Sequence, residues 1–329
     1  MNSQRLVFRS HGKPAEVLEM EDFAPPALKT GEVLLAIHAA PINPADLNFI
    51  EGTYGIRPTL PACAGMECCA TVIASESDRF APRDQVIPVT QIGSWATHVV
   101  TSEENLIKIP AGIDPLQAAM LKVNPATAWL LLHRFADLEK GDTVVLNASN
   151  SGVGQCVIQL AADFGIRTVC FLRNEELFPT LKNLGARHVF PDSAEGFDEA
   201  KAILGKDRAR LAFNAVGGDS ALRLMKLLSD GGTHVTYGAM GRKPLTVPNG
   251  PLIFADIRVR GLWVTKWMEN ASPEELESTY GLLAERLASG VLKQQVDSTF
   301  TLPDFPQALE RLEATERNGK ILFKNPLAN

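Results

Sequence analysis

The chain has 329 residues, of which 45% are hydrophobic and 21% are charged, and its formal net charge is −6. This composition is typical of a globular protein with a sizeable core, and the length is typical of about two domains. Because binding to nucleic acid requires clustered cations, the net negative charge argues against a nucleic-acid partner. The sequence has no run of ~18 apolar residues, so neither a membrane-spanning helix nor a membrane partner is predicted.

The start of the chain and its cysteines bear on the compartment. The first residues pass directly into an alternating pattern, without the apolar segment of a signal peptide or an Arg- and Ser-rich transit segment. The five cysteines are odd in number and fit no disulfide framework. Cys68, Cys156 and Cys170 lie in apolar runs, as small core residues do. We therefore expect a cytoplasmic protein in a reducing compartment.

The first third of the chain is predicted to be rich in β-structure. Short apolar stretches recur along it, at residues 31–40, 67–75, 84–89 and 95–100. Pro and Gly residues punctuate the sequence between them, as between Gly52 and Pro61. Short strands separated by turns predict a compact β domain.

In the middle third, apolar strands alternate with amphipathic helices. Strands are predicted at residues 144–148, 168–172, 211–216, 233–238 and 258–264. The first is followed by a helix that Gly165 should end, with an apolar face formed by Val157, Leu160, Ala161 and Phe164. Another helix is predicted around residues 222–228. This alternation predicts a parallel sheet with helices on both faces.

The last third returns to the first domain. A helical pattern at residues 305–312 precedes a strand-like run at residues 318–323. We infer an α/β fold in which a Rossmann-type, doubly wound parallel sheet is inserted into a β-rich catalytic domain. The expected boundaries are residues 1–123, 124–265 and 266–329.

The segment NASNSGVGQ, residues 147–155, carries the strongest chemical signal. It lies between a predicted strand and a helix, where a tight turn lets backbone N–H groups and the helix N-terminus face a pyrophosphate. The segment departs from the G-x-G-x-x-G pattern, because Gly154 is kept while Ser149 and Ser151 replace the first two glycines. The alternative is an ordinary strand-to-helix turn.

The residues after the second strand of this domain bear on the choice of cofactor. An acidic residue there favours NAD, whereas an arginine pairs with the 2′-phosphate of NADP. The strand is followed by Arg173 and Asn174, which predict NADPH, although Glu175 and Glu176 come directly afterwards. The alternative is that Arg173 is a solvated surface residue.

Several motifs along the chain match one known family. They are GEVLLAIHAAPINPADLN (31–48), GTYGIRPTLP (52–61), AGMECCATV (64–72), the turn at 147–155 and the final GKILF. On these motifs the chain resembles the medium-chain dehydrogenase/reductase superfamily, which includes quinone reductases, over essentially its whole length. INPADLN followed by GTY, NSGVGQ and RGLWVTKW (260–267) most resemble the mitochondrial-type trans-2-enoyl-CoA/acyl-carrier-protein reductases. The resemblance implies that the β-rich domain is GroES-like.

The resemblance also implies that the protein holds no metal. Zinc-dependent relatives bind the metal with Cys, His and Glu side chains. This chain has the INPAD stretch at the cysteine position and Met66 at the histidine position, beside Glu67. The four-cysteine structural lobe of those relatives is missing as well.

Functional residues follow from the same resemblance. It implies that Tyr54 hands a proton to the substrate; the alternative is a tyrosine that only packs in a Gly-flanked turn. It implies that the cofactor is contacted by Asn124, Asn150, Ser151, Gly152, Val153, Arg173, Asn174, Tyr237, Gly238, Ala239, Met240, Leu262, Trp263, Val264 and Lys320. Glu175 stands where a second arginine is typical.

The implied reaction is NADPH-dependent reduction of the activated C=C bond of a trans-2-enoyl thioester. Hydride adds to the β-carbon, and a protonated phenol, which ionises only near pH ~10, supplies a proton to the α-carbon. An NADPH-dependent quinone or enone oxidoreductase is the alternative, because Tyr54 and the cofactor turn suit both. A cofactor-binding regulatory protein without catalysis is a third possibility.

Three further features leave alternatives open. Asn43 and Asp46 either orient Tyr54 or the nicotinamide, or cap the turn at Pro44. Trp263 and Trp267 either wall the substrate pocket or pack in a core or interface. The strand at the edge of the parallel sheet would remain unpaired, which predicts a homodimer through this strand.

Overall fold

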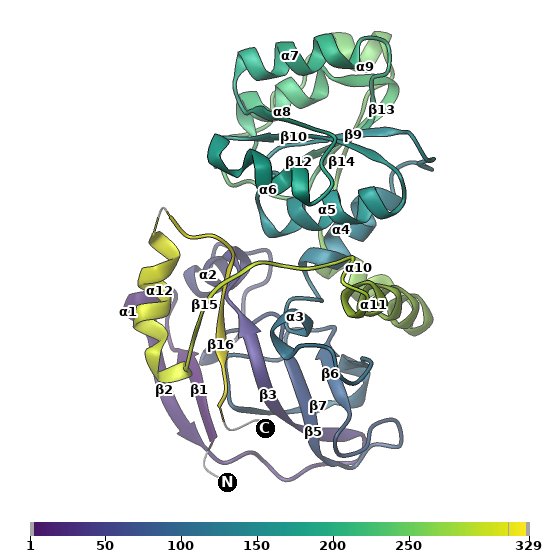
Figure 1. The fold of residues 1–329 in the computed structure, drawn as a ribbon. Helices are drawn as coiled ribbons and strands as arrows, with labels where there is room; N and C mark the ends of the chain where they lie inside the picture. Colours follow the sequence, from purple (N-terminus) through teal and green to yellow (C-terminus); the bar gives the residue numbers. More distant parts are fainter. Residues whose placement is uncertain (1–2, 315, 327–329) are drawn as a thin grey trace. The chain divides into compact units, whose positions relative to one another are not determined.

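The computed structural model describes residues 3–314 and 316–326. Its internal contacts divide the chain into two compact units. Residues 1–123 and 267–329 form one of them, called the outer unit below, and residues 124–266 form the other, called the inserted unit. Figure 1 follows the chain through both units.

The chain crosses from one unit to the other twice. The first crossing joins Val123 to Asn124, and the second joins Lys266 to Trp267. No helix of the described residues is long and apolar enough to cross a bilayer.

The inserted unit is built on a parallel sheet with the strand order β11-β10-β9-β12-β13-β14. The strands are β9 (Thr143–Leu146), β10 (Arg167–Leu172), β11 (His188–Pro191), β12 (Ala209–Asn214), β13 (Leu228–Thr236) and β14 (Arg258–Gly261). The strand order reverses between β9 and β12, which is the switch point of a doubly wound sheet. The predicted Rossmann-type fold is therefore confirmed.

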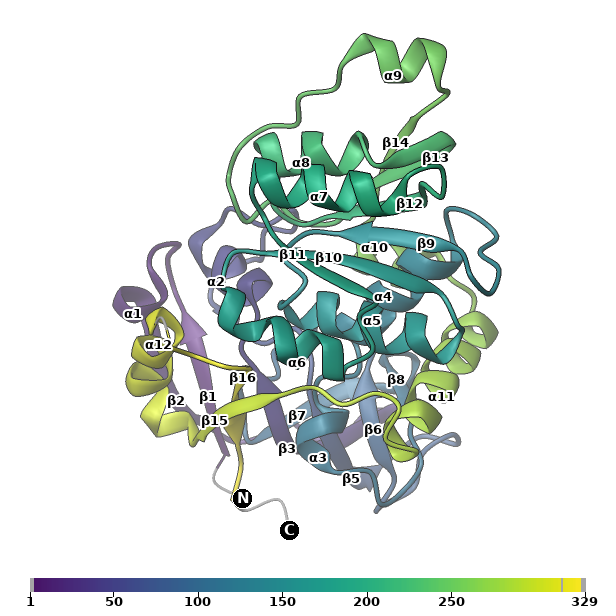
Figure 2. The same ribbon diagram turned by 45° about the horizontal axis from the view of Figure 1, so that its top comes forward.

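Helices cover both faces of this sheet (Figure 2). They are α4 (Asn124–His133), α5 (Gly152–Asp163), α6 (Phe178–Asn183), α7 (Ala194–Leu204), α8 (Gly218–Met225) and α9 (Asn249–Phe254). Helices α4, α5 and α6 lie on one face, and α7 and α8 lie on the other. Between α7 and the sheet, the rings of Phe171 and Phe197 stack with their centroids 3.7 Å apart.

Helix α5 forms where the apolar spacing predicts it. Val157, Leu160 and Ala161 on its predicted apolar face are fully buried. The helix ends at Asp163, and Gly165 follows with φ +71°, a left-handed conformation that glycine adopts without steric cost. Burial of this one face holds α5, and with it the turn at its N-terminus, against the sheet.

The outer unit contains two sheets. The larger has the order β15-β16-β3-β5-β6-β8, with β7 also paired to β3, and the smaller has the order β2-β1-β4. The strands are β1 (Ser3–Phe8), β2 (Leu18–Phe23), β3 (Glu32–Pro41), β4 (Ala62–Cys63), β5 (Cys69–Ser75), β6 (Gln85–Pro88), β7 (His98–Ser102), β8 (Leu106–Lys108), β15 (Val296–Phe300) and β16 (Lys320–Lys324). Short strands and turns therefore dominate the first third, as predicted.

The remaining helices accompany these sheets. They are α1 (Pro14–Val17), α2 (Pro44–Glu51), α3 (Pro115–Ala118), α10 (Val264–Asn270), α11 (Pro273–Ala288) and α12 (Phe305–Glu313). The C-terminal strand β16 pairs with β3 and so returns the end of the chain to the first sheet. Trp95 is fully buried in the core of this unit and meets Phe323 of β16 edge to face, with ring centroids 5.2 Å apart.

The predicted C-terminal end of the last parallel strand is wrong. Strand β14 ends at Gly261, and helix α10 begins at Val264, so the predicted strand over residues 258–264 is too long. The N–H of Leu262 still donates to Thr236 O at 3.0 Å, after which the chain turns into the helix. A short apolar run has the same appearance in a strand and in a buried helix, so apolarity alone does not place this end.

Candidate active site

The turn between β9 and α5 is closed by a serine where the usual motif has a glycine. Ser149 is fully buried, and its Oγ lies 2.9 Å from Leu146 O of β9. The same Oγ accepts the N–H of Phe171 in β10 at 3.0 Å. The hydroxyl thus bridges two neighbouring strands, which gives a structural reason for the departure from the glycine pattern.

The backbone of this turn is tight. Ala148 has φ +46°, a left-handed conformation that costs a non-glycine residue about 1–2 kcal/mol. Ser151 is the N-cap of α5, and its Oγ accepts the N–H of Gly154 at 3.1 Å. A Cβ atom on Gly154 would lie 2.6 Å from Ser149 O, so only glycine allows the helix to approach the strand this closely.

Asn124, the first residue of α4, lies against this turn. It is buried, and a Cβ atom on Gly152 would overlap its side-chain amide. Asn150 is exposed, and its carbonyl accepts the side-chain amide of Gln155 at 2.9 Å. The structure therefore brings Asn124 together with Gly152 of the predicted pyrophosphate turn, although the two are distant in the sequence.

Two buried asparagines join the carboxyl ends of three strands. Asn147, just after β9, donates from Nδ2 to Asn214 Oδ1 and to Ser220 Oγ, each at 2.9 Å. Asn214, the last residue of β12, donates to Thr236 Oγ1 of β13 at 3.1 Å. Sequence analysis missed both residues, although each is a polar residue that ends an apolar strand at the ligand-binding edge of a parallel sheet.

The loop after β13 is fixed to the same edge. The N–H of Tyr237 donates to Asn214 O at 3.0 Å, and that of Met240 donates to Ala215 O at 2.8 Å. The Tyr237 hydroxyl is buried without a hydrogen bond of good geometry. Burial raises the pKa of Tyr237, and the neighbouring Ser151 side chain offsets this only in part. A bound ligand could supply the hydrogen bond that this buried hydroxyl beside the turn lacks.

The remaining predicted cofactor residues of the inserted unit follow β10 and β14. Arg173 and Asn174 are exposed directly after β10, and Asn174 Oδ1 accepts the N–H of Glu176 at 3.1 Å. Leu262 and Trp263 follow β14, with 37% of Trp263 exposed, and Val264 is buried at the start of α10. The set as a whole lies at the carboxyl ends of parallel strands, where α/β sheets bind dinucleotides. The tight turn, the capped helix and the orphaned hydroxyl all fit NADPH.

Tyr54 belongs to the outer unit, at the C-terminal end of α2. The helix is capped by Gly52 at φ +74°, and Asn48 O accepts the N–H groups of Thr53 at 2.9 Å and Tyr54 at 3.1 Å. The Tyr54 ring is half-buried and packs against the core of this unit. The backbone of Tyr54 is thus fixed to its own helix.

The N-terminal end of α2 is capped as one of the two interpretations predicts. The N–H of Asn43 donates to Asp46 Oδ2 at 2.8 Å. Asp46 is fully buried, and burial raises its pKa to about 7, although the Asn43 N–H and the charge of Lys320 favour the ionised form. Lys320, predicted from the resemblance to reach the cofactor, donates from Nζ to Asn43 Oδ1 in the outer unit.

The two tryptophans have different surroundings. Trp267 is buried in the outer unit, where its Nε1 donates to Glu275 Oε1 at 2.7 Å and its ring lies 6.1 Å from that of Tyr280. It is therefore a core residue. Trp263 is partly exposed, and its place in the wall of a substrate pocket stays a prediction.

A pocket of about 320 Å³ lies in the outer unit close to the Tyr54 segment. It is lined by Phe49, Ile56, Pro58, Cys63, Gln91, Ile92 and Gly93. Phe49 belongs to α2, and Ile56 and Pro58 follow Tyr54 within a few residues. The pocket is shallow and widely open to solvent, and polar and apolar surface line it about equally, so it is not by itself a substrate site.

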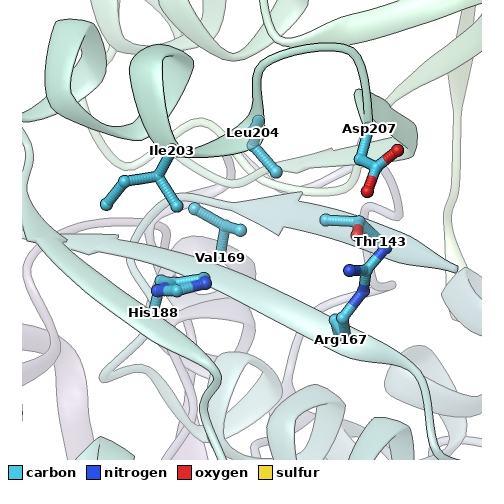
Figure 3. Close-up of a pocket in the computed structure, with 7 residues that line it drawn as sticks. All are labelled: Thr143, Arg167, Val169, His188, Ile203, Leu204 and Asp207. Carbon is cyan, nitrogen blue, oxygen red and sulfur yellow. The ribbon is translucent and has the colours of Figure 1, made fainter. Parts of the chain in front are cut away.

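A smaller cavity of about 50 Å³ in the inserted unit lies away from the ligand-binding edge. Figure 3 shows its lining residues, which are Thr143, Arg167, Val169, His188, Ile203, Leu204 and Asp207. Thr143, Arg167 and His188 begin strands β9, β10 and β11. The cavity is therefore at the amino ends of the strands, opposite the dinucleotide edge, and we assign it no part in the reaction.

Within the described residues, no group of three or more His, Cys, Asp or Glu side chains is arranged to hold a metal ion. Near Met66 the structure has instead a buried cluster of Asn43, Asp46, Glu67 and Lys122, detailed below. A metal-free protein remains a prediction, which elemental analysis of the purified protein would check.

Two family models match the chain. The alcohol dehydrogenase GroES-like domain matches residues 29–111, and the model described as zinc-binding dehydrogenase matches residues 152–280. The second match does not include Met66 or the INPAD stretch, where the zinc ligands of such relatives would lie. The first match lies within the outer unit, and the second covers most of the inserted unit and continues to residue 280 of the outer unit.

Known relatives match over most of their length. The chain is 42% identical over 314 residues to the mitochondrial enoyl-(acyl-carrier-protein) reductase of Rattus norvegicus, and 41% identical to that of Homo sapiens. Both alignments cover 93% of this chain and 84% of the relative. The reductase of the same name from Arabidopsis thaliana is 38% identical over 94% of this chain and 84% of its own.

Solved structures agree with these relatives. The mitochondrial 2-enoyl thioester reductase Etr1p/Etr2p heterodimer from Candida tropicalis superposes with a TM-score of 0.88 at 27% identity, covering 99% of this chain and 100% of that one. A complex of Etr1p with NADP and crotonyl-CoA gives a TM-score of 0.90 at 26% identity and the same coverage. A quinone oxidoreductase of Pseudomonas syringae gives 0.87 at 26% identity, covering 98% and 100%. The chain therefore belongs to the medium-chain dehydrogenase/reductase superfamily and, within it, to the family of the mitochondrial enoyl-(acyl-carrier-protein) reductases.

Proposed function

We propose that the protein reduces the C=C bond of a trans-2-enoyl thioester with NADPH. The proposal depends on one observation: a chain of this family has both a candidate proton donor and a candidate dinucleotide-binding turn. Tyr54 stands at the capped end of α2 in the outer unit, and a turn suited to a pyrophosphate lies at the carboxyl edge of the sheet in the inserted unit. Relatives that are 41–42% identical carry the name enoyl-(acyl-carrier-protein) reductase.

The reaction assigns distinct tasks to the two units. Reduced nicotinamide, when bound, supplies a hydride to the β-carbon of the substrate. The Ser149–Gly154 turn and the loop at Tyr237–Met240 orient the dinucleotide through backbone groups fixed by the network around Asn214. The thioester carbonyl takes up the negative charge as an enolate, and Tyr54 donates its phenolic proton to the α-carbon. Tyr54 then regains a proton from water.

A comparison of substrates tests this function. NADPH oxidation is measured with crotonyl-CoA, with a longer enoyl-CoA and with a simple quinone. We expect turnover of the enoyl thioesters to exceed that of the quinone by a wide margin. Turnover of the quinone alone would establish the alternative, an NADPH:quinone oxidoreductase, to which the chain also has structural likeness.

Arg173 provides a test of cofactor choice. Replacing Arg173 by Ala should raise the NADPH dissociation constant by roughly tenfold or more, because a hydrogen bond to a charged group contributes about 1.5–3 kcal/mol. NADH lacks the 2′-phosphate, so its dissociation constant should change little. Arg187→Ala removes an exposed arginine beside the amino end of β11 and serves as the control. Equal affinity of the unchanged protein for NADPH and NADH would contradict the assignment.

We also propose that the protein is a homodimer and that it is cytoplasmic. Strand β14 is the edge of the parallel sheet, and the nearby α9 exposes 69% of Ile253 and 86% of Phe254. Light scattering of the protein and of the Phe254→Asp variant tests the dimer, and a monomeric wild-type protein would contradict it.

The proposed cytoplasmic location depends on the use of the cysteines, all of which are free among the described residues. The relatives are named as mitochondrial, so cell fractionation is the test of this proposal.

A further inference from the structure

Glu67 is a buried carboxylate that uses both of its oxygens. It is fully buried, in the segment that leads into β5. Its Oε1 accepts the side-chain N–H of Asn43 at 2.8 Å, and its Oε2 accepts the backbone N–H of Val123 at 2.9 Å. Asn43 lies 24 residues before Glu67 and Val123 lies 56 residues after it, so this one side chain joins three distant segments of the outer unit.

The side-chain amide of Asn43 connects Glu67 to helix α2, which Tyr54 follows in the chain. Asn43 is the N-cap of α2, and its Oδ1 accepts Lys320 Nζ. The helix has eight residues, about two turns, and its C-terminal end holds the Tyr54 backbone through Asn48 O. Because the helix is short and Tyr54 is hydrogen-bonded to it, a shift of Asn43 should be passed along α2 to the backbone of Tyr54.

The Val123 side of Glu67 is fixed as well. Lys122 Nζ donates to Met66 O at 2.6 Å and to Thr90 O at 2.7 Å. The backbone carbonyl of Lys122 accepts the hydroxyl of Tyr280 at 2.9 Å. Val123 is therefore a fixed point of the outer unit, and it is also the last residue before the chain enters the inserted unit at Asn124.

Two ammonium groups and two hydrogen-bond donors surround the Glu67 carboxyl group and stabilise its charged form. Burial raises the pKa of Glu67, while the ammonium groups of Lys320 and Lys122 and the hydrogen bonds from Asn43 and Val123 oppose that effect. Removing one partner from such a buried set costs more than the set contributes as a whole, because the others are left unpaired. The surrounding groups therefore hold Glu67 in a defined position, and a change at any one of them should disturb the others.

We propose that Glu67 is a positioning residue of the reaction, which fixes the Tyr54 helix to the point where the chain enters the inserted unit. The inference rests on the proposed function, since it assumes that Tyr54 protonates the substrate. Glu67 acts through Asn43 and α2 and does not itself touch the reacting atoms. Its removal should therefore affect the step that Tyr54 performs and leave the predicted dinucleotide residues of the inserted unit intact.

A double-mutant cycle with Tyr54→Phe tests the proposal. Glu67→Gln keeps the shape of the side chain but has one acceptor oxygen in place of two, so either Asn43 or Val123 loses its partner. We expect kcat with crotonyl-CoA to fall about tenfold, because a small misplacement of a catalytic group has effects of this size or larger. In the Tyr54→Phe background the same substitution should change kcat less than about twofold, since residues that act together are not additive. The NADPH dissociation constant should change less than about twofold in both backgrounds, because all of the predicted cofactor residues except Lys320 belong to the inserted unit.

The controls separate this role from simple destabilisation. Asp84→Asn removes a carboxylate of the same unit that accepts the Ala81 N–H at 3.0 Å and pairs with Lys108, remote in sequence from α2. It should leave kcat unchanged. Should Glu67→Gln fail to fold, Asn43→Ser removes the amide that bridges Glu67 to α2 and that accepts Lys320 Nζ, and it keeps a capping side chain, so the same cycle applies.

The outcomes are distinguishable. Equal loss of kcat from Glu67→Gln with and without the Tyr54 hydroxyl would overturn the proposal, as would a rise in the NADPH dissociation constant with kcat unchanged. Absence of turnover of enoyl thioesters by the wild-type protein would instead contradict the proposed function. Loss of kcat that disappears in the Tyr54→Phe background supports both.

Discussion

Replacing Tyr54 by Phe is expected to lower kcat for enoyl-thioester reduction by about tenfold or more. The substitution keeps the ring that packs against the core of the outer unit and removes only the hydroxyl. General-acid assistance typically contributes ~10²–10⁴-fold, and water replaces part of it when the acid is lost. The NADPH dissociation constant should stay nearly unchanged, because the predicted dinucleotide residues, apart from Lys320, belong to the inserted unit.

The kinetic pattern identifies the role of the hydroxyl. A parallel fall in kcat and kcat/KM marks the loss of an interaction made only in the transition state. A cofactor deuterated at the transferred position shows through its isotope effect whether hydride transfer limits the rate. Unchanged turnover with that step rate-limiting would mean that water or another residue protonates the α-carbon and that Tyr54 only packs.

Local patterns were sufficient to predict the fold of the inserted unit. Helix α5 follows from the apolar spacing of Val157, Leu160 and Ala161 and from Gly165 at its end, both of which are encoded within fourteen residues. The β9–α5 turn was found from its place between a strand and a helix, although two of its glycines are replaced. Its structure adds the reason, since Ser149 bridges β9 and β10 with its side chain.

Features that depend on distant segments were not predicted. Glu67 has no local signal beyond its place beside Met66, because its partners lie 24 and 56 residues away and no local pattern joins them. Asn147 and Asn214 did leave a signal, since each ends an apolar strand, but their hydrogen bond to one another depends on strand order. The end of β14 was misplaced for a related reason, because apolar residues such as Leu262 and Val264 suit a strand and a helix equally.

The roles of the candidate residues remain predictions for a physical reason. The geometry places Asn124, Ser151 and Tyr237 around one turn. The backbone N–H groups of such a turn can bind more than one kind of anionic ligand, so the fold alone does not identify the ligand. Arg173 is exposed after β10, where either a 2′-phosphate or solvent satisfies it. Measurements of cofactor binding by single variants therefore test the roles of these residues directly.

Replacing Gly154 by Ala is expected to weaken NADPH binding by roughly 10–100-fold and to lower the melting temperature. The added Cβ would lie 2.6 Å from Ser149 O and 2.8 Å from the Cα and carbonyl carbon of the same residue. These are backbone atoms of a segment fixed to β9 and β10, so the clash moves the turn itself. Overpacking typically costs about 1–3 kcal/mol, and a clash of 2.6 Å with backbone atoms belongs at the upper end of that range, above the gain of about 1 kcal/mol that Ala brings to a helix.

Gly281→Ala is the matched control for this prediction. Gly281 lies within α11, and a Cβ atom there would meet nothing within 4 Å. Only the helix propensity acts at this position, so the melting temperature should stay the same or rise and NADPH affinity should not change. Fluorescence titration with NADPH and thermal unfolding of both variants give the comparison. If Gly154→Ala bound NADPH as tightly as Gly281→Ala, the β9–α5 turn would not be the pyrophosphate site, and the dinucleotide would have to bind elsewhere on the sheet edge.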